Sequence, residues 1–178
     1  MKTEHLLIMR FTALGEVAML VPVVSSLAQQ YPELRITVLS NPFARSLFDG
    51  IAHNVGFMAA DLNGEYHGVK GLNALYRRLV AKNFTAIADM QSILRSSYLR
   101  MRFNISSYRV EHLDNHRQDR RKLVATKDKC LRQLPSLFDD YIDVLARLGY
   151  NVRLDFQSLF PPTGGNLRLV SDRIGEKK

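Results

Sequence analysis

One carboxylate in this sequence stands where a proton could be moved. Glu16 follows the segment 11–15, Phe-Thr-Ala-Leu-Gly, which comes directly after the apolar run 5–9. In open parallel sheets, ligands bind where the carboxyl end of a strand meets the next helix, and a carboxylate there could accept a proton from a bound hydroxyl group. Position alone favours a simpler role, because an acid in the first turn stabilises a helix by about 0.3–1 kcal/mol. The residues therefore leave Glu16 as a helix-stabilising acid or a general base.

A second group of polar residues follows another apolar run. Asp89 directly follows the apolar run 84–88, and Gln91 comes two residues later. If both apolar runs are parallel strands, Asp89 lies on the same edge of the sheet as Glu16. Asp before a helical segment is also a typical N-cap, because its carboxylate accepts hydrogen bonds from free backbone N–H groups. Both interpretations of Asp89 remain open at this point.

Other chemistries have weaker support. A dinucleotide-binding loop needs the pattern Gly-x-Gly-x-x-Gly, whereas Gly15 stands alone, which still permits a tight turn and a close backbone approach. His112 and His116 have the i, i+4 spacing of a metal pair on a helix, but no third ligand or His-Glu-x-x-His pattern accompanies them. No Ser-His-Asp or Cys-His arrangement stands out. We expect no metal site and no nucleophilic triad.

Apolar runs alternate with amphipathic segments along the chain. Short apolar runs predict strands, here over 5–9, 35–39, 55–58, 84–88 and 105–110. Apolar residues spaced by three and four, or helix-initiating residues, predict helices over 17–28, 42–48, 69–81, 92–103 and 137–148. This alternation predicts an α/β domain, a Rossmann-like parallel sheet with helices on both faces.

Four features interrupt or end these elements. Pro22 lies inside the first helical pattern, so either the helix bends there or a new helix begins at Pro22. The segment 111–134 is charged and has no apolar period, and it predicts a long surface loop. Gly149 is expected to end the last helix, and the Pro- and Gly-rich segment 160–165 predicts a linker.

Composition is that of an ordinary globular domain. The 178 residues suffice for one domain with a full core, and they are 46% hydrophobic and 24% charged. The single cysteine, Cys130, excludes an internal disulfide framework and a multi-cysteine zinc site. The N-terminal apolar run is too short for a signal peptide, and no uncharged stretch reaches the roughly 20 residues of a membrane span. We expect a cytoplasmic protein.

Positive charge is concentrated in one segment. The net charge of the chain is +8, and residues 95–133 hold eleven Arg or Lys against four Asp or Glu, a net of +7. A field of this sign attracts an anionic partner, such as an acidic membrane surface, a phosphorylated substrate or nucleic acid. Nucleic acid is not expected, because the segment has no recognition motif and no interleaved aromatic residues for base stacking.

Three stretches resemble a known enzyme family. Residues 6–42 resemble the opening of the family 9 glycosyltransferases, the ADP-heptose:lipopolysaccharide heptosyltransferases, with the sequence LLIMRFTALGEVAMLVPVVSSLAQQYPELRITVLSNP. Residues 84–100, FTAIADMQSILRSSYLR, are similar to the second signature of that family, and the positions that match it are Asp89, Gln91, Arg95 and Ser96. Residues 136–150, SLFDDYIDVLARLGY, resemble the helix that closes its first domain.

The resemblance implies the N-terminal half of a two-domain GT-B glycosyltransferase. The implied reaction is the inverting transfer of heptose from ADP-heptose to the lipopolysaccharide inner core, without an essential metal or other cofactor. In the family, an Asp that follows the loop Gly is the proposed base, and Glu16, one methylene longer, stands at that position. The acceptor-binding residues expected on this basis are Thr12, Ala13, Gly15, Asp89, Gln91, Arg95, Arg117, Arg120 and Arg121.

The resemblance also implies domain boundaries and partners. Residues 1–160 are expected to form the acceptor-side domain and 161–178 to begin the interdomain segment, so that the donor domain lies outside this chain and the chain alone is inactive. The expected partner is the lipopolysaccharide core or another acidic glycolipid, whose anionic groups suit bidentate arginine contacts, with peripheral contact at the inner membrane. The alternative is a non-catalytic module that binds an anionic glycolipid or membrane surface through 95–133.

Overall fold

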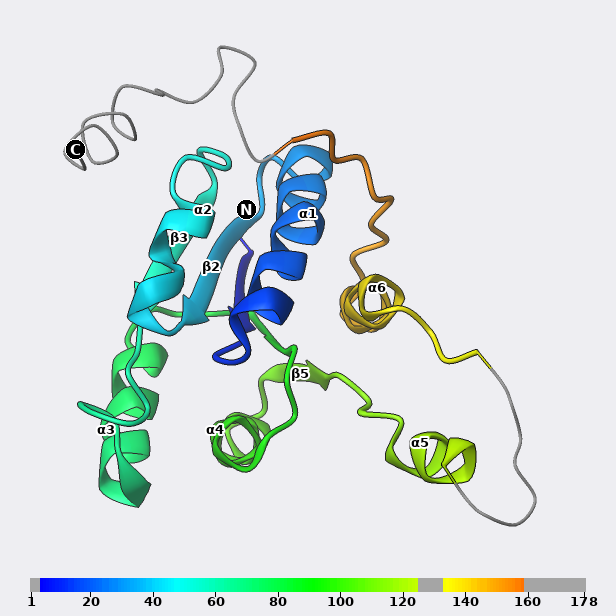
Figure 1. Cartoon of the computed structure of the whole chain (residues 1–178). Coiled ribbons are helices and arrows are strands. Elements are labelled where there is room, and N and C mark those ends of the chain that lie inside the picture. The colour runs from blue at the N-terminus through cyan, green and yellow to red at the C-terminus, as the bar shows by residue number, and fades with distance from the viewer. Residues whose placement is uncertain (1–3, 125–132, 159–178) are drawn as a thin grey trace, which may run out of the picture.

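The computed structural model of the protein describes residues 4–124 and 133–158, which are built around a sheet of five parallel strands (Figure 1). The strand order is β3-β2-β1-β4-β5, and every neighbouring pair is parallel. Strand β1 (His5–Met9) is central and all five of its residues are buried, which explains its uninterrupted apolar sequence. The other strands are β2 (Arg35–Ser40), β3 (Val55–Ala59), β4 (Ala86–Asp89) and β5 (Arg109–His112).

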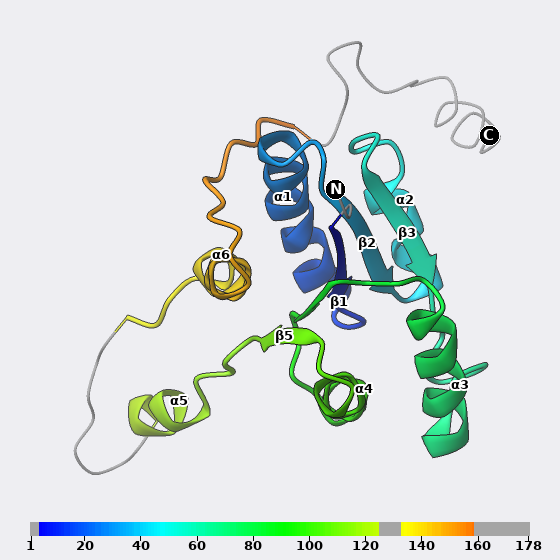
Figure 2. The same ribbon diagram turned by 180° about the vertical axis from the view of Figure 1, so that it is seen from behind.

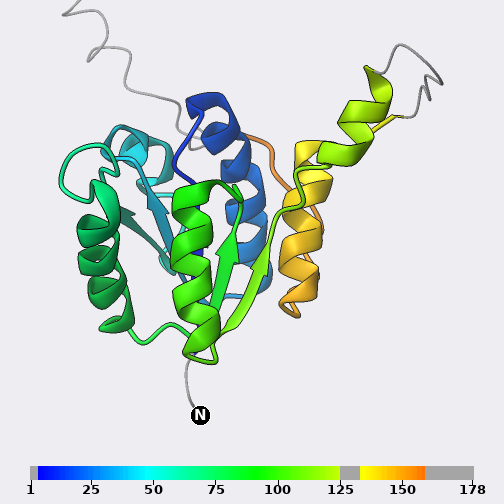
Figure 3. The ribbon, with the colours of Figure 1, turned by 90° about the horizontal axis from the view of Figure 1, so that it is seen from below.

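Helices cover both faces of the sheet (Figures 2 and 3). Leu6 and Ile8 of β1 point into the hydrophobic cluster on one face, while Leu7 and Met9 point into the cluster on the other, as the alternation of a strand requires. The first face carries α1 (Leu14–Gln30), η1 (Pro42–Ala44), α2 (Arg45–Phe48) and α6 (Leu137–Arg147). The second face carries α3 (Gly68–Val80) and α4 (Leu94–Ile105). The predicted fold class is therefore confirmed.

Helix α1 runs without interruption through Pro22. The alternative in which a new helix begins at Pro22 is therefore wrong. Proline removes one helical hydrogen bond, but Leu20 and Val21 before it and Val23 and Val24 after it are all fully buried. Packing of this face against the sheet outweighs the missing bond.

Two predictions around the basic segment are wrong. Ile105 ends α4 instead of beginning a strand, and β5 begins only at Arg109. The segment 111–134, predicted to be a loop, contains the end of β5 and the helix α5 (Arg117–Leu123). Helix α5 buries no residue, so its sequence carries no apolar period, and Ile105 is apolar but 74% exposed. The spacing of apolar residues indicates secondary structure only where one face of an element is buried. Neither α5 nor Ile105 is buried, so the sequence pattern was misleading at both places.

The last described segment packs back along α1. Residues 150–158, orange in Figure 1, follow the left-handed Gly149 (φ 93°), which ends α6 as predicted. The Asp155 N–H donates to Ser26 Oγ at 2.9 Å, and Gln30 Nε2 donates to the Arg153 carbonyl at 2.6 Å. These bonds attach the segment to α1 as far as Asp155. Cys130, the linker predicted over 160–165 and the segment 161–178 lie outside the described residues.

Candidate active site at the carboxyl edge of the sheet

The loops that follow β1 and β4 leave the sheet side by side. Met9 and Asp89 are register partners at the ends of these neighbouring strands. Gln91 joins the two loops, because its Oε1 accepts from the Phe11 N–H at 2.9 Å and its Nε2 donates to the Thr12 carbonyl at 3.0 Å and to the Thr12 hydroxyl. The structure therefore brings the two polar groups of the sequence to one edge of the sheet.

Glu16 lies in the first turn of α1 and is anchored through one carboxylate oxygen. Its Oε2 accepts from the Ala13 N–H at 3.2 Å and from the guanidinium of Arg10. The side chain is 49% exposed, and its Oε1 has no hydrogen-bond partner in residues 4–124 and 133–158. The prediction of a helix-stabilising acid is confirmed, and it leaves the second oxygen available to a ligand.

Gly15 lies inside α1 and not in the loop. The N-cap is Ala13, so Gly15 is the second helical residue, and the tight turn that a lone glycine permits is not formed at Gly15. A Cβ placed on Gly15 would meet no atom within 4 Å. A side chain at Gly15 would therefore project into open space. Thr12 and Ala13, which precede it, are exposed at the same edge.

Arg10 is the residue of this site that the sequence interpretation missed. Its side chain is buried, and its guanidinium donates to Glu16 and to the Met90 carbonyl and lies 5.6 Å from the centroid of the Tyr141 ring. Tyr141 of α6 donates its hydroxyl to the Glu16 carbonyl at 2.9 Å, and burial raises the pKa of Tyr141, which keeps that hydroxyl protonated. A buried arginine directly after a fully buried strand needs a carboxylate partner, and Glu16 is the first acid that follows Arg10 in the sequence.

Asp89 is fully buried and shapes the loop that carries Gln91. Its Oδ1 accepts from the Gln91 and Ser92 N–H groups at 3.1 and 3.0 Å, and its Oδ2 lies 3.3 Å from the Arg100 guanidinium. The N-cap interpretation of Asp89 is wrong, because α4 begins at Leu94 with Ile93 as its N-cap. The positive φ of Ser92 (52°) keeps that residue out of the helix.

The predicted arginines lie elsewhere. Arg95 donates to the Leu62 carbonyl at 3.1 Å and to Asn63 Oδ1 at 2.7 Å, which braces the loop after β3. Arg117, Arg120 and Arg121 are exposed on α5, which lies apart from the loop after β1 in all three views (Figures 1, 2 and 3). The structure thus assembles Glu16, Thr12, Ala13, Gly15, Asp89 and Gln91, and it leaves the α5 arginines outside this cluster.

The two histidines suggested by spacing do not share a site. His116 forms an ion pair with Asp140 of α6, with 2.8 Å between Nε2 and Oδ1, whereas His112 ends β5. Among residues 4–124 and 133–158, no group of three or more His, Cys, Asp or Glu could hold a metal ion.

The His116–Asp140 pair predicts a pH-dependent contribution to stability. The hydrogen bond that His116 Nε2 donates to the Asp140 carboxylate raises the pKa of His116 above its ordinary value of 6.5. The contribution of the pair to the free energy of unfolding is therefore fully present below the pKa of His116 in the unfolded chain. It is lost as pH rises through the pKa of His116 in the folded protein. We expect Asp140→Asn to lower the free energy of unfolding by about 1 kcal/mol at pH about 5.5 and by less at pH about 8.5. Urea unfolding of both proteins at each pH measures this, and a deficit that grows with pH would contradict it.

Fold and site together define a class of protein. It is a Rossmann-like α/β domain with a half-exposed, arginine-anchored carboxylate at the edge where such domains bind ligands. No model of a known protein family and no curated protein matches the chain.

Solved structures of glycosyltransferases share this fold. The glycosyl transferase family 9 protein from Veillonella parvula has a TM-score of 0.61 at 16% identity, over 99% of this chain and 52% of that one. The E. coli heptosyltransferase WaaC with ADP has a TM-score of 0.58 at 16% identity, over 87% of this chain and 50% of that one. The same enzyme with ADP-2-deoxy-2-fluoro heptose gives 0.61 at 15% identity, over 90% and 56%. The chain thus spans about half the length of these structures, and the similarity is one of fold.

Proposed function

We propose that this chain is the acceptor-side domain of a glycosyltransferase that transfers heptose from ADP-heptose to the lipopolysaccharide inner core. The observation that carries the proposal is the Glu16 carboxylate, whose Oε2 is anchored by buried Arg10 while the half-exposed side chain offers Oε1 at the carboxyl edge of the central strand. The motifs at 6–42 and 84–100 and the fold shared with heptosyltransferase structures support it.

In the proposed reaction Glu16 is the general base. The acceptor hydroxyl donates a hydrogen bond to Glu16 Oε1, and its oxygen attacks the anomeric carbon of the heptose. As that bond forms, Glu16 accepts the hydroxyl proton, and the bond from the anomeric carbon to the diphosphate oxygen breaks. ADP leaves with the bonding electrons, and attack from the opposite side inverts the anomeric configuration. The donor binds in a second domain outside this chain, and no metal or other cofactor takes part.

The surrounding residues hold this geometry. Arg10 is a positioning residue, because it fixes Glu16 Oε2 and also binds the loop after β4 through the Met90 carbonyl. Asp89 is buried and acts through the loop that it shapes, whereas Thr12 and Ala13 are exposed and can contact the acceptor directly. Arg95 and the three α5 arginines, Arg117, Arg120 and Arg121, would bind anionic groups of the core farther from the reacting hydroxyl.

The proposal is tested by assaying a protein in which this chain continues into its donor domain. We expect a heptose-free core acceptor to gain the mass of one heptose when ADP-heptose is supplied, with release of one ADP for each transfer. ADP release that does not depend on the acceptor, or transfer from another nucleotide sugar in preference to ADP-heptose, would contradict the proposed reaction. The proposed location is the cytoplasm, at the inner face of the inner membrane.

A second candidate function rests on an exposed apolar stripe on α4. Leu94, Met101 and Ile105 lie on the side of the helix opposite the buried Ser96, Leu99 and Phe103. Arg95 and Arg102 lie beside the stripe, and α5 adds three exposed arginines. An apolar stripe flanked by cations is typical of helices that lie on anionic membrane surfaces. Within the described ranges, no helix is long and apolar enough to cross a membrane.

Replacing the three α5 arginines tests this second function. If the domain docks on an anionic bilayer, changing Arg117, Arg120 and Arg121 to Gln should weaken binding to phosphatidylglycerol vesicles by about 100-fold, since each basic residue near the surface contributes about 1 kcal/mol. Co-sedimentation at increasing salt measures it. The matched control changes three exposed basic residues outside α4 and α5, namely Lys70 and Arg77 of α3 and Lys82 in the turn after it. Equal weakening in both triple variants would contradict docking through α5.

A further inference from the structure

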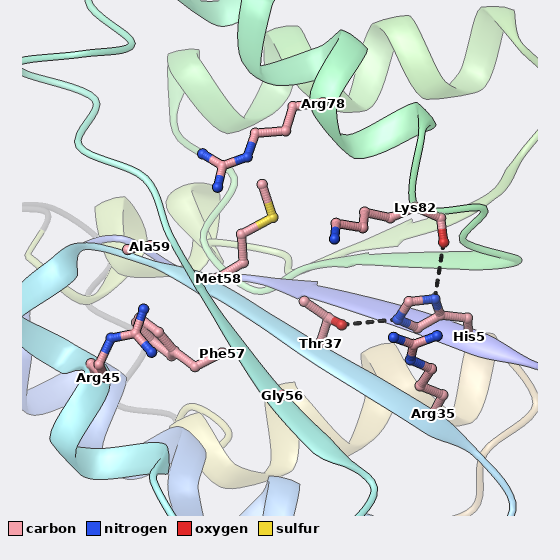
Figure 4. A pocket seen from close by; sticks show the side chains of 10 residues that line it. All are labelled: His5, Arg35, Thr37, Arg45, Gly56, Phe57, Met58, Ala59, Arg78 and Lys82. Carbon is pink, nitrogen blue, oxygen red and sulfur yellow. Dashed lines mark hydrogen bonds between the residues drawn. The ribbon is translucent and has the colours of Figure 1, made fainter.

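A cationic pocket runs along the edge strand β3, and its residues His5 and Arg35 lie at the end of the sheet opposite to Glu16. The pocket has a volume of about 320 Å³ and lies between the end of α3 and the strands β2 and β3 (Figure 4). His5 and Arg35, which line it, begin β1 and β2, whereas Glu16 follows the far end of β1. The pocket therefore belongs to neither the candidate active site nor the basic segment 95–133.

Three cations without carboxylate partners line this pocket. Arg35 comes from the strand, and Arg78 and Lys82 come from α3 and the turn after it. None of the lining residues is acidic, and none of these three cations forms an ion pair with a described carboxylate. A fourth, Arg45, lies across β3 with its guanidinium 5.2 Å from the centroid of the Phe57 ring (Figure 4). Concave surfaces lined by one sign of charge concentrate ions of the other sign.

Neutral groups fix the backbone of Lys82 and the side chain of Arg78. The Lys82 carbonyl can only accept, so His5 Nδ1 donates to it at 3.2 Å, and His5 Nε2 then accepts from the Thr37 hydroxyl at 2.9 Å. Burial, together with the nearby charges of Arg35 and Lys82, lowers the pKa of His5, which keeps the ring neutral. On the other wall, Arg78 donates to the Tyr66 hydroxyl at 2.6 Å. The end of α3 is thus tied to the strands beneath it.

The floor of the pocket is open because β3 carries a glycine there. Gly56 lies on the same face of β3 as Met58, and a Cβ at Gly56 would project into the pocket and meet only the Ile36 carbonyl, at 3.8 Å. Its φ is not in the left-handed region, so the backbone does not require glycine. A side chain at this position would fill the pocket without straining the strand.

We propose that this pocket binds the phosphomonoester group of a small phosphorylated ligand through Arg35, Arg78 and Lys82. Arginine offers paired N–H donors that match phosphate oxygens, and lysine adds a compact charge. A phosphomonoester carries close to two negative charges at neutral pH, which suits several unpaired cations. A volume of about 320 Å³ admits a group larger than phosphate itself, such as a phosphorylated sugar.

Calorimetric titration of the whole chain with glucose 6-phosphate tests the proposal, with glucose as the neutral control. We expect glucose 6-phosphate to bind and glucose not to bind. Arg35→Gln and Lys82→Gln should each weaken binding by about tenfold, as expected for loss of one charge-assisted contact. The matched control is Arg77→Gln, which removes the same charge from the neighbouring position of α3, outside the pocket. Equal loss in Arg77→Gln would show a general field effect and would overturn the proposal.

Filling the pocket provides a second, charge-neutral test. Gly56→Val favours the strand conformation, so the protein should remain folded by circular dichroism while glucose 6-phosphate binding is lost. Unchanged binding in the folded Gly56→Val protein would overturn the proposal. Glu16→Gln should leave the affinity unaltered, so failure here is distinguishable from failure of the transferase proposal.

Vesicles distinguish the two sources of a phosphomonoester. Phosphatidic acid in phosphatidylcholine vesicles presents it on a lipid headgroup, whereas glucose 6-phosphate presents it free in solution. Vesicle binding that is weakened by Arg35→Gln and Lys82→Gln but not by Arg77→Gln supports a lipid source of the same chemistry. Absence of binding to both probes overturns the proposal.

Discussion

Replacing Glu16 with glutamine is expected to lower the rate of heptose transfer by about 10²–10⁴-fold. Glutamine keeps the length of the side chain and can still accept from the Ala13 N–H, but it cannot take a proton from the acceptor hydroxyl. The loss should fall on kcat, with little change in the KM for the acceptor, because the acceptor hydroxyl can still form a hydrogen bond to the amide. ADP release by the protein that carries both domains measures it.

Two variants control for other effects of this change. Glu33→Gln removes an exposed carboxylate from the turn between α1 and β2 and should leave turnover unchanged. Glu16→Asp keeps a carboxylate on a shorter arm and should retain more activity than Glu16→Gln, although less than the original protein, because proton transfer depends on reach. Near-normal turnover of Glu16→Gln would remove Glu16 from the mechanism.

Replacing Asp89 with alanine is expected to cause the largest loss of stability, about 3–5 kcal/mol. The change leaves the mostly buried Arg100 guanidinium without its carboxylate, and it removes the acceptor of the Gln91 and Ser92 N–H groups. Asp89→Asn should cost less, because the amide oxygen can still accept from those N–H groups. Chemical unfolding measured by circular dichroism gives both free energies.

The control for this prediction is an aspartate on the surface. Asp49 is exposed at the end of α2, and Asp49→Ala should change the free energy of unfolding by no more than about 0.5 kcal/mol. If Asp89→Ala and Asp49→Ala destabilise the protein equally, the hydrogen bonds of Asp89 do not hold the loop after β4, and its place in the site must be revised.

The sheet and one functional side chain could be predicted from local sequence. Strand β1 is buried on both faces, so its apolar run is unmistakable, and the first-turn position of Glu16 follows from the helical pattern after it. These features depend on residues within a few positions of one another. Helix α5 also depends on neighbouring residues, but none of its residues is buried. Its sequence therefore has no apolar period that would predict a helix.

The parts of the site that escaped prediction depend on contacts between distant segments. Gln91 bonds to Thr12 across 79 positions, and Arg10 reaches the Met90 carbonyl across 80, because β4 pairs directly with β1. Tyr141 reaches the Glu16 carbonyl across 125 positions. The sequence predicts that β1 and β4 end at one edge, but which side chains meet there depends on the strand order.

The central claim, that the edge beside Glu16 holds the acceptor, is tested most directly by titrating the ¹⁵N-labelled chain with lipopolysaccharide core oligosaccharide. We predict saturable amide shift changes at Thr12, Ala13, Gly15 and Glu16 on one loop and at Gln91 and Ser92 on the other, and we predict that they persist in Glu16→Gln. Shift changes confined to α5, with the amides of both loops unmoved at saturation, would contradict the account.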